Sequence, residues 1–117
     1  MRRLVLVLTV VALAGAAAAY ASSSATIFKI SASPTALKYS TSKLAAKAGK
    51  VTIVMSNPSP LMHNIAIKGN GVKAAGKIVQ KGGVSTVSAT LKKGTYTFYC
   101  QVPGHEAAGM KGTLVVG

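Results

Sequence analysis

A few side chains near the C-terminus have the types and the spacing of a transition-metal site. Cys100 is followed after four intervening residues by His105, and His105 after four more by Met110. Cys100 is the only cysteine of the chain, and the one other histidine, His63, lies upstream beside an asparagine. One thiolate, two imidazoles and one thioether form the ligand set of a blue-copper electron-transfer site. The sequence therefore predicts a single copper ion held by these four residues.

Taken one at a time, these residues have simpler interpretations. A lone methionine usually fills a gap in a core, and a lone cysteine or histidine is more often a buried structural residue. The joint spacing favours metal binding. Zinc could use the same donors, although zinc sites usually rely on more thiolates or on histidine and carboxylate sets. The only carboxylate side chain, Glu106, follows a predicted ligand, and we expect it to point to solvent.

The same donor set argues against catalysis. A thiolate and two imidazoles in a plane, with a weak axial thioether, suit both oxidation states of copper and leave no position open for a substrate. Copper enzymes need further ligands, and the chain has no third histidine to supply them. We therefore predict that the protein is not an enzyme.

Ligands spread between residues 63 and 110 need a rigid scaffold, and the hydropathy pattern predicts an all-β domain. Residues 42–48 read as a short helix or a loop. Short strands separated by turn signals favour a β-sandwich of about seven to eight strands. Strands are expected over residues 25–33, 36–40, 51–57, 62–68, 76–80, 84–91, 95–100 and 112–116.

The strand register predicts where the ligands lie. His63 lies at the start of one predicted strand and Cys100 at the end of another. Because alternate side chains of a strand point to the same face, both residues are expected to face the core with their apolar neighbours. If these strands are antiparallel, both residues reach the same end of the sandwich. Pro103 and Gly109 would bend the connecting loop so that His105 and Met110 return to the same point.

The N-terminus reads as a secretory signal peptide over residues 1–21. A basic start is followed by an apolar run over residues 4–19 and a small-x-small cleavage pattern that ends at Ala21. The run is shorter than the roughly 20 residues of a membrane span, so an uncleaved N-terminal anchor is the alternative. Residues 22–117 would form one exported domain, periplasmic or at the cell surface. A lone cysteine there cannot form an internal disulfide, which favours a metal-held thiolate.

The charge of the chain is strongly positive. Fourteen lysines and arginines face one acidic residue, a net charge of +13. Without the signal peptide, twelve scattered lysines and Glu106 remain, a net charge of +11. The lysines form a self-repelling, soluble surface, or they steer the protein toward an acidic redox partner or an anionic cell surface.

We predict no nucleic-acid partner, because aromatic residues do not alternate with the lysines. We expect a monomer that meets a membrane only if residues 1–21 are retained.

The stretch from residue 94 to residue 116, which contains the spaced cysteine, histidine and methionine, resembles the C-terminal copper loop of the cupredoxins. The spacing is similar to that of auracyanin and rusticyanin. Azurin has one residue fewer before the methionine, and plastocyanin has two fewer between the cysteine and the histidine. The segment around His63 and Asn64 resembles the family's first-histidine segment. The resemblance covers roughly residues 27–117.

The resemblance implies a Greek-key sandwich with one type 1 copper ion. It implies ligation by Nδ1 of His63 and His105, by Sγ of Cys100 and by Sδ of Met110, with Asn64 locking the two ligand segments by hydrogen bonds. The implied function is that of an exported electron carrier, with copper storage or delivery as the alternative. Many relatives dock through acidic or mixed patches, and this chain departs from them because its surface is almost purely basic.

Overall fold

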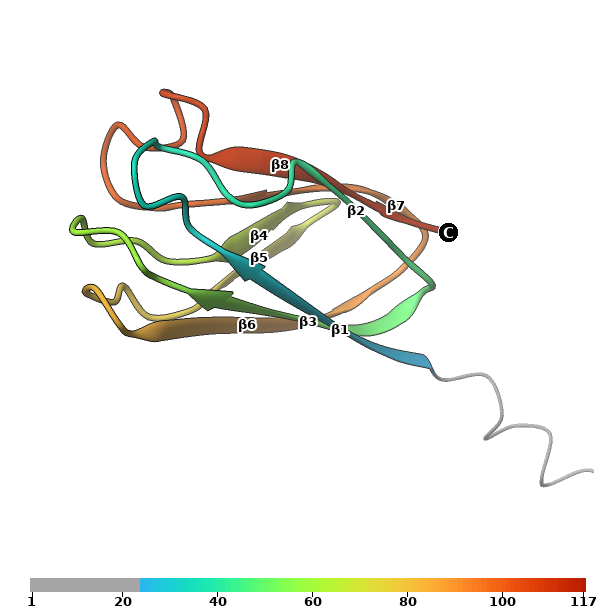
Figure 1. Ribbon diagram of the computed structural model, residues 1–117. Helices are drawn as coiled ribbons and strands as arrows, with labels where there is room; N and C mark the ends of the chain where they lie inside the picture. Colours follow the sequence, from blue (N-terminus) through green and yellow to red (C-terminus); the bar gives the residue numbers. More distant parts are fainter. Residues whose placement is uncertain (1–23) are drawn as a thin grey trace, which may run out of the picture.

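The computed structural model describes residues 24–117, which form a sandwich of two mixed β-sheets (Figure 1). The three-stranded sheet has the order β1-β3-β6, and the five-stranded sheet has the order β2-β8-β7-β4-β5. The strands are β1 (Ser24–Ser31), β2 (Lys43–Ala46), β3 (Gly49–Ser56), β4 (Ala66–Gly69), β5 (Val72–Ala75), β6 (Val84–Leu91), β7 (Gly94–Tyr99) and β8 (Lys111–Val116). The prediction of an all-β sandwich with about seven to eight strands is confirmed.

Alternating burial along the strands explains why the two sheets pack together. In β3, Val51, Ile53 and Met55 are fully buried, whereas the residues between them are exposed or half-buried. In β7, Tyr96 and Phe98 face the same core, and Cys100 follows in phase. Removing this apolar surface from water is the main favourable contribution to the fold. The core cluster includes Cys100 and Met110, so it extends to two of the predicted ligands.

All of the predicted ligand segments lie at one end of the sandwich. Antiparallel pairing of β4 with β7 and of β7 with β8 brings the chain before Ala66, after Tyr99 and before Lys111 to the same edge. In Figure 1 these connections form the loops at the left, away from the C-terminus. We refer to this edge as the loop end.

Two predictions about the first half of the chain are wrong. Residues 42–48 contain strand β2, not a helix or loop, because Leu44 pairs beside Leu114 of β8 and packs on the core. This tertiary pairing overrides the helix tolerance of an alanine-rich segment. Residues 36–40 do not form a strand. Only Tyr39 makes a bridge, to Ala32, and its buried ring packs against the core.

Two further strand boundaries differ from the prediction. The strand expected over residues 62–68 begins only at Ala66, and His63 makes an isolated bridge with Val79 instead. The strand expected over residues 76–80 is replaced by β5, which ends at Ala75. The N–H of Gly76 still donates to the carbonyl of Ile65, and a side chain at Gly76 would meet the backbone of β6.

Residues 1–21, predicted to be a signal peptide, lie outside the described residues. Within residues 24–117, no helix is long and apolar enough to cross a membrane.

Candidate metal centre

Three of the predicted ligands meet at the loop end of the sandwich. The Nδ1 atoms of His63 and His105 are 3.2 Å apart. The sulfur of Cys100 is 3.9 Å from Nδ1 of His63 and 3.7 Å from Nδ1 of His105. Two of the three residues are buried and His105 is half-buried. Three donor atoms therefore converge from two distant parts of the sequence.

The three separations fit one metal ion between the donor atoms. An ion bonded to nitrogen at about 2.0 Å and to sulfur at about 2.3 Å, with bond angles of about 100–120°, separates two nitrogens by about 3.1–3.5 Å and nitrogen from sulfur by about 3.3–3.7 Å. The observed distances lie within these ranges or about 0.2 Å outside them. A trigonal set of two imidazoles and one thiolate is the in-plane arrangement of a blue-copper site.

The orientation of His63 also favours a metal. Its side chain is fully buried, and within residues 24–117 its Nε2 atom has no hydrogen-bond partner. A buried polar atom without a partner is costly and is rare in folded proteins. The ring is turned so that Nδ1 faces the other two donors, and no internal hydrogen bond to Nε2 holds it in that position. Ligation through Nδ1 gives a reason for this orientation.

Backbone hydrogen bonds hold the His63 segment in place. The N–H of His63 donates to the carbonyl of Val79, and the N–H of Val79 donates back to His63. The buried amide of Asn57 donates to the carbonyls of Leu61 and Val79 at 2.9 and 3.0 Å. The segment between Pro58 and His63 is thus tied to the chain that precedes β6.

The loop between β7 and β8 brings His105 back toward Cys100. At its base, the N–H of Cys100 donates to the carbonyl of Met110, and the N–H of Met110 donates to the carbonyl of His105. Gly109 has a φ of 114°, a conformation that favours glycine, so the predicted bend at this position is confirmed. Met110 is fully buried at the end of the loop, and these two backbone bonds place it beside Cys100 and His105.

Asn64 joins the two ligand segments, as the resemblance implies. Its Nδ2 donates to Oε1 of Gln101 at 2.9 Å and to the carbonyl of Gly76 at 3.1 Å. Its Oδ1 accepts from the N–H of Gln101 at 2.7 Å. Because Asn64 follows His63 and Gln101 follows Cys100, these bonds fix the relative positions of two predicted ligands. Such outer-shell contacts orient metal ligands and tune their properties.

Sequence reasoning missed three residues that support the site. Gln101 completes the Asn64 bonds, and Asn57 braces the histidine segment. Tyr39 donates its hydroxyl to the carbonyl of Asn64 at 2.6 Å. Gln101 could have been suspected because it adjoins a ligand. The one feature of the sequence that could have indicated Tyr39 is that it is the single aromatic residue in a segment of otherwise small and polar residues.

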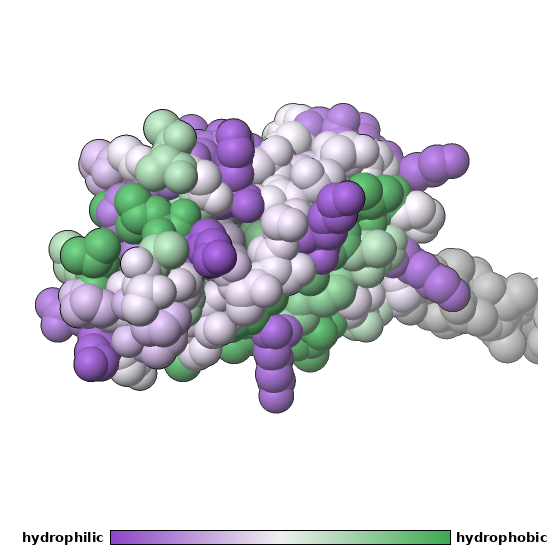
Figure 2. All heavy atoms as spheres, turned by 45° about the horizontal axis from the view of Figure 1, so that its top comes forward, coloured by the Kyte–Doolittle hydropathy of each residue, from purple (hydrophilic) through white to green (hydrophobic). Residues whose placement is uncertain are grey.

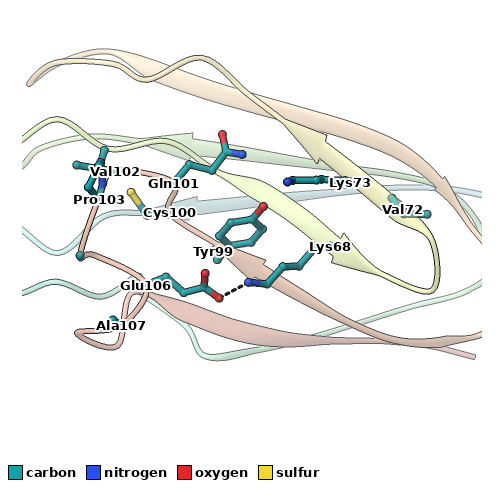
Figure 3. Close-up of a pocket in the computed structure, with 11 residues that line it drawn as sticks. Lys68, Val72, Lys73, Tyr99, Cys100, Gln101, Val102, Pro103, Glu106 and Ala107 are labelled. Carbon is teal, nitrogen blue, oxygen red and sulfur yellow. Dashed lines mark hydrogen bonds and ion pairs between the residues drawn. The ribbon is translucent and has the colours of Figure 1, made fainter.

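Glu106 does not simply point to solvent, which corrects the expectation for this residue. Its carboxylate pairs with Nζ of Lys68 on β4, and the two side chains are 32% and 41% exposed. The Lys68 ammonium also lies 4.2 Å from the centre of the Tyr99 ring (Figure 3). The ion pair connects the residue after His105 to the five-stranded sheet.

Burial shifts two pKa values at the centre. Desolvation, and secondly the neighbouring His105, lower the pKa of His63 from its ordinary value of 6.5. The ring is therefore neutral near pH 7, which is the form that binds a metal. Burial, and secondly the negative charge of Cys100, raise the pKa of Tyr39 well above its usual range. The Tyr39 hydroxyl thus keeps its proton for the bond to Asn64.

Residues 26–117 match the sequence profile described as copper binding proteins, plastocyanin/azurin family. The chain belongs to this family. The predicted cupredoxin identity and the prediction of copper are therefore confirmed, and His63, Cys100, His105 and Met110 form a type 1 copper-like site for one ion.

Solved structures of auracyanins and of amicyanin have the same fold. Auracyanin from the photosynthetic bacterium Roseiflexus castenholzii is 27% identical, with a TM-score of 0.70 over 81% of this chain and 98% of its own. Auracyanin A from Chloroflexus aurantiacus, described as a "blue" copper protein, is 23% identical, with a TM-score of 0.69 over 80% of this chain and 100% of its own. An amicyanin variant is 21% identical, with a TM-score of 0.57 over 78% of this chain and 82% of its own.

Proposed function

We propose that His63, Cys100, His105 and Met110 bind one copper ion and that the protein is an exported carrier of single electrons. The observation that carries the proposal is the convergence of two imidazole nitrogens and one thiolate within 3.9 Å of one another. When bound, the ion supplies a one-electron couple between Cu(II) and Cu(I). The site offers no open position for a substrate, so we propose no enzymatic role.

The protein contributes rigidity and exclusion of water. Asn64 and Gln101 hold the two ligand segments together, so the donor atoms have little freedom to move when the charge of the site changes. His63, Cys100 and Met110 are buried, and His105 is the one member of the set that reaches the surface. We therefore propose that electrons enter and leave through the exposed edge of His105.

An absorption spectrum tests the copper site. Purified protein with Cu(II) is expected to show a strong thiolate-to-copper band in the visible range, and Cys100→Ser is expected to abolish it. Met110→Leu should alter the band, whereas Met62→Leu, which changes an exposed methionine (52%) next to His63, should leave it unchanged. Absence of a band from the native protein would refute the proposal.

An apolar collar around His105 is the proposed electron-exchange face. Its residues come from the two ligand loops and are exposed or half-buried: Pro60, Leu61, Val102, Pro103, Ala107 and Ala108. The neighbouring Met62 is also exposed. Figure 2 shows apolar atoms at the loop end between projecting hydrophilic side chains. Such an apolar patch within a polar rim is typical of a docking surface.

A single charge tests the collar. Ala107→Asp is expected to slow electron exchange with the physiological partner, because a carboxylate would be buried in the contact. Ala25→Asp, at an exposed position on β1 in the three-stranded sheet, is the matched control and should have little effect. If the two variants exchanged electrons with the partner at equal rates, the collar would not be the electron-exchange face.

Export and domain organisation are part of the proposal. We propose that residues 1–21 direct export and are cleaved, leaving residues 22–117 as one monomeric domain in the periplasm or at the cell surface. Mass spectrometry of the secreted protein tests this. A species that keeps residues 1–21 and sediments with membranes would support the anchored alternative.

Redox proteins with an acidic docking surface are the proposed partners, because the chain carries lysines almost without acids. Their association rate should fall as the salt concentration rises. Copper storage or delivery is disfavoured because two of the three converged donors are buried, which hinders release. Repeated oxidation and reduction without copper loss separates an electron carrier from a delivery protein.

A further inference from the structure

The outer face of the five-stranded sheet carries a row of residues that crosses all five strands. Lys43 of β2 lies opposite Thr113 of β8, and Thr113 lies opposite Thr97 of β7. Thr97 lies opposite Lys68 of β4, and Lys68 lies opposite Lys73 of β5. Residues directly opposite each other point to the same face of a sheet. With neighbouring strands about 4.8 Å apart, the row is about 19 Å long.

A fourth lysine extends this row toward the loop end. Lys111 lies opposite Tyr99, two residues along from Thr113 and Thr97, and so shares their face. We call the set of Lys43, Lys68, Lys73 and Lys111 the lysine face. Lys68 and Lys73 are direct cross-strand neighbours, and like charges in that position destabilise a sheet. Glu106 balances Lys68 and is the only acidic side chain of the protein, so Lys43, Lys73 and Lys111 keep charges that an acidic partner would neutralise.

Two hollows on this face meet at Glu106. One, of about 610 Å³, is lined by residues that include Lys68, Lys73, Tyr99 and Gln101 (Figure 3). The other, of about 460 Å³, is lined by residues that include Lys43 and Lys111. Glu106 lines both, and its carboxylate is paired with Lys68. The only acidic side chain of the protein thus pairs with one lysine of this face at the point where the two hollows meet.

The lysine face also adjoins the collar. The larger hollow is lined by Val102, Pro103 and Ala107 in addition to its lysines. A partner that covers the collar would therefore bring the edge of its own surface over the lysines of β4 and β5. This arrangement has an apolar centre and a charged rim, as protein–protein contacts commonly do.

We infer that the lysine face binds carboxylate side chains of an acidic segment on the redox partner. The inference rests on the proposed function, because it assigns the partner's charged contact to one face among the scattered lysines. A protein segment is favoured over an anionic membrane because side chains can enter the two hollows and reach the lysines beside Glu106. A flat layer of lipid headgroups would contact the lysine tips alone.

Two triple variants of equal charge test the inference. The first, Lys43→Gln with Lys73→Gln and Lys111→Gln, removes exposed lysines of this face and leaves the Lys68–Glu106 pair intact. The second is the control, with glutamine at three exposed lysines elsewhere: Lys29, Lys50 and Lys92. Both lose three positive charges, so a difference between them reports position rather than net charge.

The probe is a hexaglutamate peptide, titrated into the isotope-labelled protein at low salt and followed by nuclear magnetic resonance. Peptide binding is expected to perturb the resonances of residues on the lysine face and around Glu106. The first triple variant should bind about tenfold more weakly and the control about twofold or less. Equal weakening in the two variants would overturn the inference. Binding of the face to vesicles of anionic phosphatidylglycerol, but not to the peptide, would also overturn it.

The titration is made with the copper-free and the Cu(I)-loaded protein. Because the lysine face lies on the sheet, the peptide is expected to bind both forms. If the protein binds the peptide but shows no thiolate-to-copper band with Cu(II), the proposed function is refuted and the lysine face is not. A copper band with Cu(II) but no localised peptide binding would do the reverse.

Discussion

The bonds of Asn64 give the prediction that most directly connects structure to metal binding. Asn64→Ala removes three hydrogen bonds, two donated to Gly76 and Gln101 and one accepted from the N–H of Gln101. Gln101→Ala removes only the bond that Asn64 donates to the Gln101 side-chain oxygen. The bond from the backbone N–H of residue 101 to Asn64 is kept. The pair of variants thus separates the whole connection from one part of it.

The expected magnitudes follow from the number of bonds. Each net hydrogen bond contributes about 0.5–1.5 kcal/mol to the free energy of unfolding. Asn64→Ala should therefore cost about 2–4 kcal/mol and Gln101→Ala about 0.5–1.5 kcal/mol. Because His63 and Cys100 would also lose their fixed separation, Asn64→Ala should weaken copper binding by about 10–100-fold.

Urea unfolding of the copper-free variants measures the first quantity, and competition with a chelator measures the second. If the two variants lost the same stability, the bonds of Asn64 to Gly76 and to the Gln101 backbone would contribute nothing. If Asn64→Ala kept native copper affinity, the connection would not position the ligands. Either result would refute the reasoning.

Three further outcomes are expected. Gly112→Ala should destabilise the fold by at least about 2 kcal/mol in urea unfolding, because the new Cβ would lie 2.1 Å from the buried Phe98 ring. The copper-free protein should lose stability as the pH falls below 6.5, because the lowered pKa of His63 lets the unfolded chain, and not the folded one, take up a proton there. His63→Leu should flatten that dependence, and a native curve in the variant would contradict the assignment. Lys68→Met should lower the copper reduction potential and Glu106→Gln should raise it, because each leaves one charge of the ion pair unbalanced. Shifts of the same sign in voltammetry would contradict this account.

The ligand positions could be predicted from the sequence because few residues were available for the task. With one cysteine and two histidines, the spacing left almost no choice of donors. The strand register then placed Cys100 correctly, since Tyr96 and Phe98 precede it in phase. Tyr39 and Asn57 could not be found in the same way. Their roles depend on loops that approach the site only in three dimensions.

The errors in the fold have a common cause. Residues 42–48 and 76–80 are short, and their local propensities are weak. Leu44 becomes part of a strand because β8 is beside it, whereas Val79 makes only an isolated bridge, to His63. Long alternating segments such as β3 and β6 were predicted well because burial along one whole face determines them.

The position of β8 within its sheet determines when the site can be assembled. β8 is the last of the eight described strands in chain order, and it lies between β2 and β7, so it holds two earlier strands together. Met110 immediately precedes it. A growing or partly translocated chain therefore cannot complete the five-stranded sheet or the ligand set, and pairing over such long sequence separations is slow. The donor set for copper would therefore be completed only after β8 has paired with both of its neighbours.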